Sequence, residues 1–149
     1  MAVNMVDIGA PREDVFATLV DPHTYPQWLI GCQDIRVVDD GWPAPGTRFH
    51  HRVGLGPFTV ADYTESLAVD RGQSLALRVR ARPLLRAARV VYELQDNSTG
   101  TRVVMTERPL APATRRLWNP LIDGLTRLRN RRSLERLKNM VEARATIKG

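Results

Sequence analysis

The 149-residue sequence predicts an α+β fold, in which an antiparallel sheet of about seven strands is followed by one long C-terminal helix. Two observations lead to this fold class. Between residues 34 and 108, six short segments of alternating apolar and polar residues follow one another, separated by turn-forming residues. After residue 112 the apolar residues recur every three or four positions, which is the period of an α-helix. The length suits one domain, and no repeat or linker divides residues 1–149.

The N-terminal segment predicts one strand and two short helices. Residues 3–8 alternate weakly and indicate a strand. Pro11, Glu13 and Asp14 then mark the start of a helix that extends to residue 20, because proline suits the first turn and acidic side chains favour the positive end of the helix dipole. A second short helical piece is expected at residues 22–29, with Asp21 as its N-cap.

The middle of the chain predicts the remaining six strands. They are expected at residues 34–39, 47–55, 58–69, 74–82, 89–95 and 102–108. The segments between them are rich in Gly, Asp, Asn and Pro, and they are short enough for hairpins. This spacing indicates an antiparallel meander.

The C-terminal helix has two apolar stripes. The first consists of Leu117, Leu121, Leu125 and Leu128, and the second of Leu134, Leu137, Val141 and Ala145. At about 100° per residue the two stripes lie on nearly opposite faces. The helix therefore either bends near residues 129–133 or buries different faces against different partners, and Pro120 is expected to break or bend it near its start. Thr126, Asn130 and Ser133 lie on the face that continues from Ile122 toward Leu137 and Met140, and if this face points inward, the middle of the helix adds a small polar patch to an apolar interior.

The composition restricts the classes of protein to which the chain can belong. The 43% hydrophobic and 26% charged residues are typical of a globular protein. No apolar run reaches the roughly 20 residues that span a bilayer, and the N-terminus has no apolar signal-peptide core, so we expect a cytoplasmic protein. Cys32 is the only cysteine, which excludes an intramolecular disulfide and argues against a thiolate metal site. We expect no cofactor.

The net charge of +6 is concentrated at one end of the chain. Residues 113–149 contain ten basic and three acidic residues, so this segment alone carries a formal +7. The sequence has no zinc-finger spacing, aromatic RNA-binding signature or helix-turn-helix pattern, which argues against nucleic-acid binding. Contact of the basic terminal helix with an anionic surface is kept as one hypothesis of function. Arg78, Arg80 and Arg82 are interpreted as a solvated basic stripe and not as an anion site.

Four short motifs stand in a characteristic order along the chain. They are Ala10-Pro11 followed by Val15-Phe16, the segment DPHTYPQW at residues 21–28, Pro45-Gly46-Thr47 at the start of a strand, and Leu137-Lys138 with Glu142. Together with the order of the elements, they resemble the START-like or helix-grip (SRPBCC) superfamily, in its polyketide cyclase/dehydrase and lipid-transport branch. The resemblance covers essentially the whole chain. It implies a strongly curved sheet wrapped around the long helix, with a cavity between them for hydrophobic or amphipathic molecules.

Strand alternation predicts which side chains face that cavity, because adjacent strand residues point to opposite faces. His50 and His51 therefore cannot both line it: His51 is expected inside and His50 outside. The inward set on the strands is Phe49, His51, Val53, Leu77, Val79, Val90, Tyr92 and Met105. Glu107 shares the face of Met105, either as an inward carboxylate or as a rim residue paired with an arginine.

Other candidates for the cavity wall are less tightly constrained by alternation. In residues 58–69 the alternation does not decide which side chains face the cavity, so Tyr63 and Glu65 are candidates only. Trp28 lies either at the edge of the cavity, as the resemblance implies, or in the core. The helix is expected to contribute Ile122, Thr126 and Asn130. Trp42 and the turn at residues 54–57 are candidate gates.

The leading functional hypothesis is binding or transport of a hydrophobic or aromatic small molecule, such as a polyketide, fatty-acyl or isoprenoid compound, in the internal cavity. The alternative is a cyclase or dehydratase-type enzyme with His51 as general acid/base, Tyr63 or Tyr92 holding a carbonyl, and Glu107 orienting the histidine. For His51 itself, a hydrogen-bonded wall residue is favoured over a ligand or catalytic contact, and both over a metal ligand. The expected partner is the hydrophobic ligand, and a weak homodimer is left open.

Overall fold

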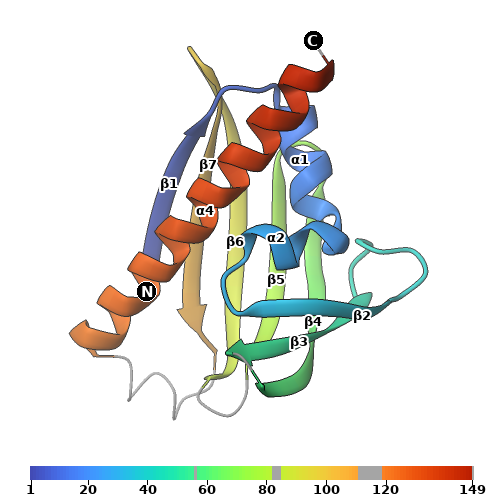
Figure 1. Ribbon diagram of the computed structural model, residues 1–149, viewed down its shortest axis with the longest axis vertical. Coiled ribbons are helices and arrows are strands. Elements are labelled where there is room, and N and C mark those ends of the chain that lie inside the picture. The colour runs from blue at the N-terminus through green and yellow to red at the C-terminus, as the bar shows by residue number, and fades with distance from the viewer. Residues whose placement is uncertain (56, 82–84, 111–118, 149) are drawn as a thin grey trace.

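The computed structural model describes all residues except 56, 82–84, 111–118 and 149, and it contains one seven-stranded antiparallel sheet. The strands are β1 (Ala2–Ile8), β2 (Cys32–Val38), β3 (Arg48–Leu55), β4 (Phe58–Asp70), β5 (Ser74–Ala81), β6 (Leu85–Asn97) and β7 (Gly100–Pro109). Their order in the sheet is β1-β7-β6-β5-β4-β3-β2, so β2 to β7 form the predicted meander and β1 pairs with β7. Figure 1 shows β2 and β3 running across the direction of β1 and β5–β7, so the sheet is strongly curved.

The helices lie on one face of this sheet (Figure 1). They are α1 (Arg12–Val20), the 3₁₀ turn η1 (Pro22–Thr24), α2 (Tyr25–Trp28) and α4 (Pro120–Lys148). Asp21 caps the second piece as predicted, since its Oδ1 accepts a hydrogen bond from the backbone N–H of His23 at 3.0 Å. At the start of α4, Asn119 Oδ1 accepts from the N–H of Ile122 at 3.0 Å, and Pro120 occupies the first helical position. This is the helix-grip arrangement of a curved sheet and a long C-terminal helix.

Most strand boundaries lie within two residues of their predicted positions, and β6 differs most. It begins at Leu85 instead of residue 89, because pairing with β5 at Ala81 and with β7 at Pro109 continues the ladder beyond the alternating segment. The sequence pattern shows which side chains face a core, whereas hydrogen-bond pairing also extends through residues without such a pattern.

The two apolar stripes of the C-terminal helix have different environments. Leu134, Leu137 and Val141 are buried in the core, and Thr126, Asn130 and Ser133 are buried on the same side. Leu121, Leu125 and Leu128 are instead 70%, 60% and 44% exposed. The helix is continuous from Pro120 to Lys148, so only one stripe is buried against the described part of the chain. Leu117 and the expected helical residues before Asn119 lie outside the described residues. None of the described helices is long and apolar enough to cross a bilayer.

Candidate ligand-binding cavity

A cavity of about 700 Å³ lies between the inner face of the sheet and the helices. Its described wall comes from β2 to β7, from α2 and the segment joining it to β2, and from α4. This volume falls within the range of roughly 300–1,000 Å³ that small-molecule sites in proteins occupy.

Ten of the residues expected at the cavity line it. From β3 and β5 these are Phe49, His51, Val53, Leu77 and Val79. From β6, β7 and α4 they are Val90, Tyr92, Met105, Glu107 and Asn130. The same register places His50 outside, where its ring lies 6.1 Å from that of Tyr63. Strand alternation therefore assigns the two histidines to opposite faces correctly.

The expectation that Tyr63 lines the cavity is wrong. On β4 the buried side chains are Asp62, Thr64 and Ser66, while the Tyr63 hydroxyl accepts a hydrogen bond from Arg80 on the outer face at 2.9 Å. Glu65 also lies outside, where it pairs with Arg48 at 3.0 Å. A bulge between Ser66 and Ala68 shifts the pairing with β5, and the inward set of this strand is more polar than its outward set.

Three other expected residues are absent from the described cavity wall. Trp28 is fully buried in the core, where its indole N–H donates to Thr24 Oγ1 at 3.0 Å and its ring lies 4.9 Å from Tyr25. Thr126 is buried and Ile122 half-buried on α4, one and two turns before Asn130, and neither lines the cavity. Among the described residues, α4 therefore reaches the cavity through Arg129 and Asn130 alone.

The β3–β4 hairpin forms part of the cavity mouth. Gly54 has φ +142°, and a Cβ atom on it would clash with the carbonyl oxygen of Phe58, so this position requires glycine. Phe58 lines the cavity and yet is 84% exposed, which places it where the cavity meets solvent. Trp42, the other candidate gate, is held in place instead: its N–H donates to the carbonyl of Val20 at 2.7 Å and its ring packs on Phe49 at 4.9 Å.

His51 is a neutral part of the wall. Its Nε2 shares a hydrogen bond of 2.9 Å with Thr64 Oγ1, and the residue is 3% exposed. Burial lowers the pKa of the imidazole to about 4, against a smaller opposing effect of the Asp62 charge. Its Nδ1 is buried without a hydrogen-bond partner among the described residues. At neutral pH the ring is therefore uncharged, with one nitrogen still to be satisfied.

Glu107 and Arg129 form an ion pair at a second part of the wall. Arg129 Nη2 donates to both carboxylate oxygens, at 2.7 and 2.8 Å, and Asn130 Nδ2 donates to Oε1 at 3.5 Å. The Glu107 side chain is 4% exposed and that of Arg129 34%. The sequence left open whether Glu107 points inward or pairs with an arginine, and in the structure it does both. Burial raises the pKa of the neighbouring Tyr92 phenol, and the charge of Glu107 adds to this effect.

Glu107 does not hydrogen-bond to His51. The two residues stand on β7 and β3, with β6, β5 and β4 between them in the sheet. Each has its own partners, Arg129 and Asn130 for the carboxylate and Thr64 for the imidazole. The cavity therefore has two separate polar groups set into apolar surroundings. Within the described residues, no three His, Cys, Asp or Glu side chains gather as metal ligands would.

Sequence comparison gives the same family as the motifs. Residues 2–142 match the family described as polyketide cyclase / dehydrase and lipid transport. The chain belongs to this family. Membership confirms the resemblance in the sequence, and the family's description covers both catalysts and lipid carriers. No curated protein matches the chain significantly.

Solved structures share the fold of this family member at low sequence identity. A Rhodobacter sphaeroides protein superposes with a TM-score of 0.75 at 16% identity, over 95% of this chain and 91% of its own. The protein MLL2253 from Mesorhizobium loti gives 0.71 at 22% identity, over 95% and 96% of the two chains. The Zhui aromatase/cyclase from Streptomyces sp. R1128 gives 0.72 at 13% identity, over 97% and 94%. These likenesses establish the helix-grip fold.

Proposed function

We propose that the protein reversibly binds a hydrophobic or aromatic small molecule, of polyketide, fatty-acyl or isoprenoid type, in the cavity under α4. The observation that carries this proposal is the apolar wall of the roughly 700 Å³ cavity, to which Leu77, Val90 and Met105 contribute buried side chains. Transfer of a ligand from water into such surroundings is favourable by about 0.8 kcal/mol for each CH₂ group that is buried. The exposed Phe58 lies where the cavity meets solvent, and we expect the ligand to enter there.

The state of the titratable wall residues favours binding over acid–base catalysis. A general base works best with a pKa near the operating pH. The pKa of about 4 makes His51 a weak base at neutral pH, and Arg129 occupies both oxygens of Glu107.

A cyclase or dehydratase-type enzyme is the second candidate. It is favoured by one observation, the unpartnered Nδ1 of an imidazole at the cavity wall. In this candidate His51 would exchange a proton with the ligand and the Tyr92 hydroxyl would hold a carbonyl. His51→Gln should then abolish turnover of a poly-ketone substrate, whereas in a carrier it should change affinity alone. His50→Gln is the matched control, because that ring lies on the outer face.

Uptake of the uncharged dye N-phenyl-1-naphthylamine tests the proposed cavity. Val90 and Val91 are consecutive on β6, but Val90 lines the cavity and Val91 lies on the opposite face. Val90→Trp should fill the cavity and weaken binding of the dye at least about ten-fold, while Val91→Trp should leave it within about two-fold. Thermal melting establishes that both variants fold. Equal affinities in two folded variants would contradict the proposed function.

A further inference from the structure

Three arginines lie side by side on the face of the sheet opposite the cavity. The register pairs Arg78 with Arg89 and Arg89 with Arg108, so they are direct cross-strand neighbours on β5, β6 and β7. The row beside them, Leu77, Val90 and Glu107, lines the cavity, and the arginines therefore point outward. Directly opposite residues have Cα atoms about 5 Å apart, and like charges at this spacing repel each other. We call these three residues the arginine row.

Among the residues that the structure describes, no carboxylate pairs with the arginine row. Elsewhere in the described structure arginines pair with acids, as Arg12 does with Asp96 at 2.9 Å and Arg102 with Asp7 at 2.8 Å. Within the described residues, none of the three arginines of the row forms an ion pair or hydrogen bond, and the Nε of Arg89 is buried without a partner. The nearest acid by register, Glu65 opposite Arg78, is bound to Arg48.

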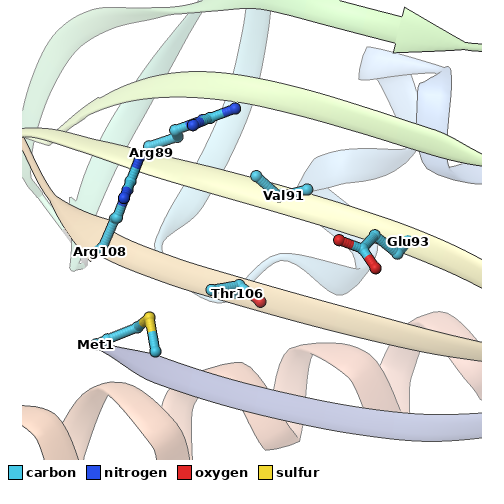
Figure 2. Close-up of a pocket in the computed structure, with 6 residues that line it drawn as sticks. All are labelled: Met1, Arg89, Val91, Glu93, Thr106 and Arg108. Atoms are coloured by element: carbon cyan, nitrogen blue, oxygen red, sulfur yellow. The ribbon is translucent and has the colours of Figure 1, made fainter.

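A groove of about 300 Å³ opens beside this row. Figure 2 shows Arg89 and Arg108 next to each other at one end of the groove and Glu93 at the other, with Val91 and Thr106 between them. Met1, directly before β1, borders the groove and is 61% exposed. The groove thus combines a strongly cationic end with a hydroxyl and two apolar side chains.

We propose that the arginine row binds a phosphate group, and that Met1 and Val91 contact an apolar part of the same ligand. Guanidinium groups match phosphate oxygens with paired hydrogen bonds, and a multiply charged group neutralises several cations at once. A phosphate held between Arg89 and Arg108 would offset the repulsion along the row. This site is separate from the cavity, since the sheet lies between them. The phosphate comes from a free phosphorylated compound or from a lipid headgroup.

Calorimetric titration with inorganic pyrophosphate at low ionic strength tests the site. Arg89→Gln and Arg108→Gln should each weaken binding at least about ten-fold. Arg36→Gln is the matched control: it removes the same charge from an exposed arginine on β2, at the far edge of the sheet, and should change affinity less than about two-fold. Because Arg89→Gln relieves repulsion, its melting temperature without anion should equal or exceed that of the wild type.

Titration with lipid vesicles separates the two sources of the phosphate, and titrations with the dye and with an oligonucleotide test whether the site is distinct and specific. Loss of binding to phosphatidic acid vesicles in the same two variants would support a lipid headgroup, and loss of pyrophosphate binding alone would support a free compound. Uptake of N-phenyl-1-naphthylamine should be unchanged in Arg89→Gln, so failure of this site and failure of the cavity are distinguishable. Three results would overturn the proposal. The first is an equal loss of affinity in Arg36→Gln, and the second is a failure to bind either pyrophosphate or vesicles. The third is binding of a single-stranded oligonucleotide alone.

Discussion

Replacing Glu107 with glutamine should leave an uncompensated positive charge at the cavity wall. In the wild type, both carboxylate oxygens accept hydrogen bonds from Arg129, so this part of the wall has no net charge. Glutamine keeps the shape of the side chain but not its charge. Arg129, whose side chain is 34% exposed, would remain beside the cavity as a free cation. The cavity should then accept an anionic ligand that the wild type disfavours.

The size of the effect follows from the charges. Two opposite unit charges about 4 Å apart attract by about 4 kcal/mol at an effective dielectric constant of 20. Desolvation of the anion and of the partly exposed guanidinium offsets much of this, and we expect a net gain of about 1–2 kcal/mol, or about ten-fold in Kd. Loss of the charge-assisted hydrogen bonds should also lower the free energy of unfolding by about 1–3 kcal/mol.

Two matched dyes provide the assay. 1-Anilinonaphthalene-8-sulfonate is N-phenyl-1-naphthylamine with one added sulfonate, so the ratio of their Kd values reports the charge of the wall. The wild type should prefer the uncharged dye, and Glu107→Gln should improve binding of the sulfonate alone. Glu65→Gln removes the same charge from a pair with Arg48 on the outer face and should leave the ratio unchanged. An equal change in both variants would refute the role of the Glu107–Arg129 pair, because it would reflect net charge only.

Three other predictions concern pH, the thiol and the helix. Burial lowers the pKa of His51 from 6.5 to about 4, so the unfolded chain takes up this proton before the folded protein does as the pH falls. The resulting stability, up to about 3 kcal/mol, is complete above pH 6.5 and should be lost between pH 6.5 and 4. Urea denaturation should show a smaller loss in His51→Gln over the same range. Burial raises the pKa of Cys32 to about 12, so a thiol reagent should react slowly with the folded protein at pH 8, and rapid reaction would contradict its burial. Deletion of residues 113–149 removes the buried Leu134 and Leu137, and calorimetry should then detect no cooperative melting.

Strand alternation was sufficient to predict most of the cavity wall. It placed His51 inside and His50 outside, and it placed Val90 and Met105 on the apolar face, because each of these strands has one clearly more apolar side. It failed on β4, where Asp62 and Thr64 point inward and Tyr63 outward. Thr64 shares a hydrogen bond with His51 on β3 and Ser66 donates to the carbonyl of Pro43 in a loop, and a single-sequence pattern contains no information about such partners.

The Arg129 contact could not be predicted for a related reason. Arg129 lies between the two apolar stripes of α4, and Glu107 is 22 residues earlier on β7. Their pairing depends on the rotation and height of the helix over the sheet, which periodicity alone leaves open. Similarly, the leucine pattern at residues 121, 125 and 128 indicated a helical face but not that it would remain exposed. Local patterns therefore predict the elements and their faces, whereas contacts between distant elements require the structure.

The position of a bound apolar molecule tests the central claim most directly. A crystal of the protein soaked with 1-bromonaphthalene should show one anomalous bromine peak inside the cavity, within van der Waals contact of Val90 and Met105. The peak should disappear in Val90→Trp and persist in Val91→Trp. A bromine bound only on the outer face of the sheet, or an unoccupied cavity in crystals that bind the compound elsewhere, would contradict the proposal that this cavity holds the hydrophobic ligand.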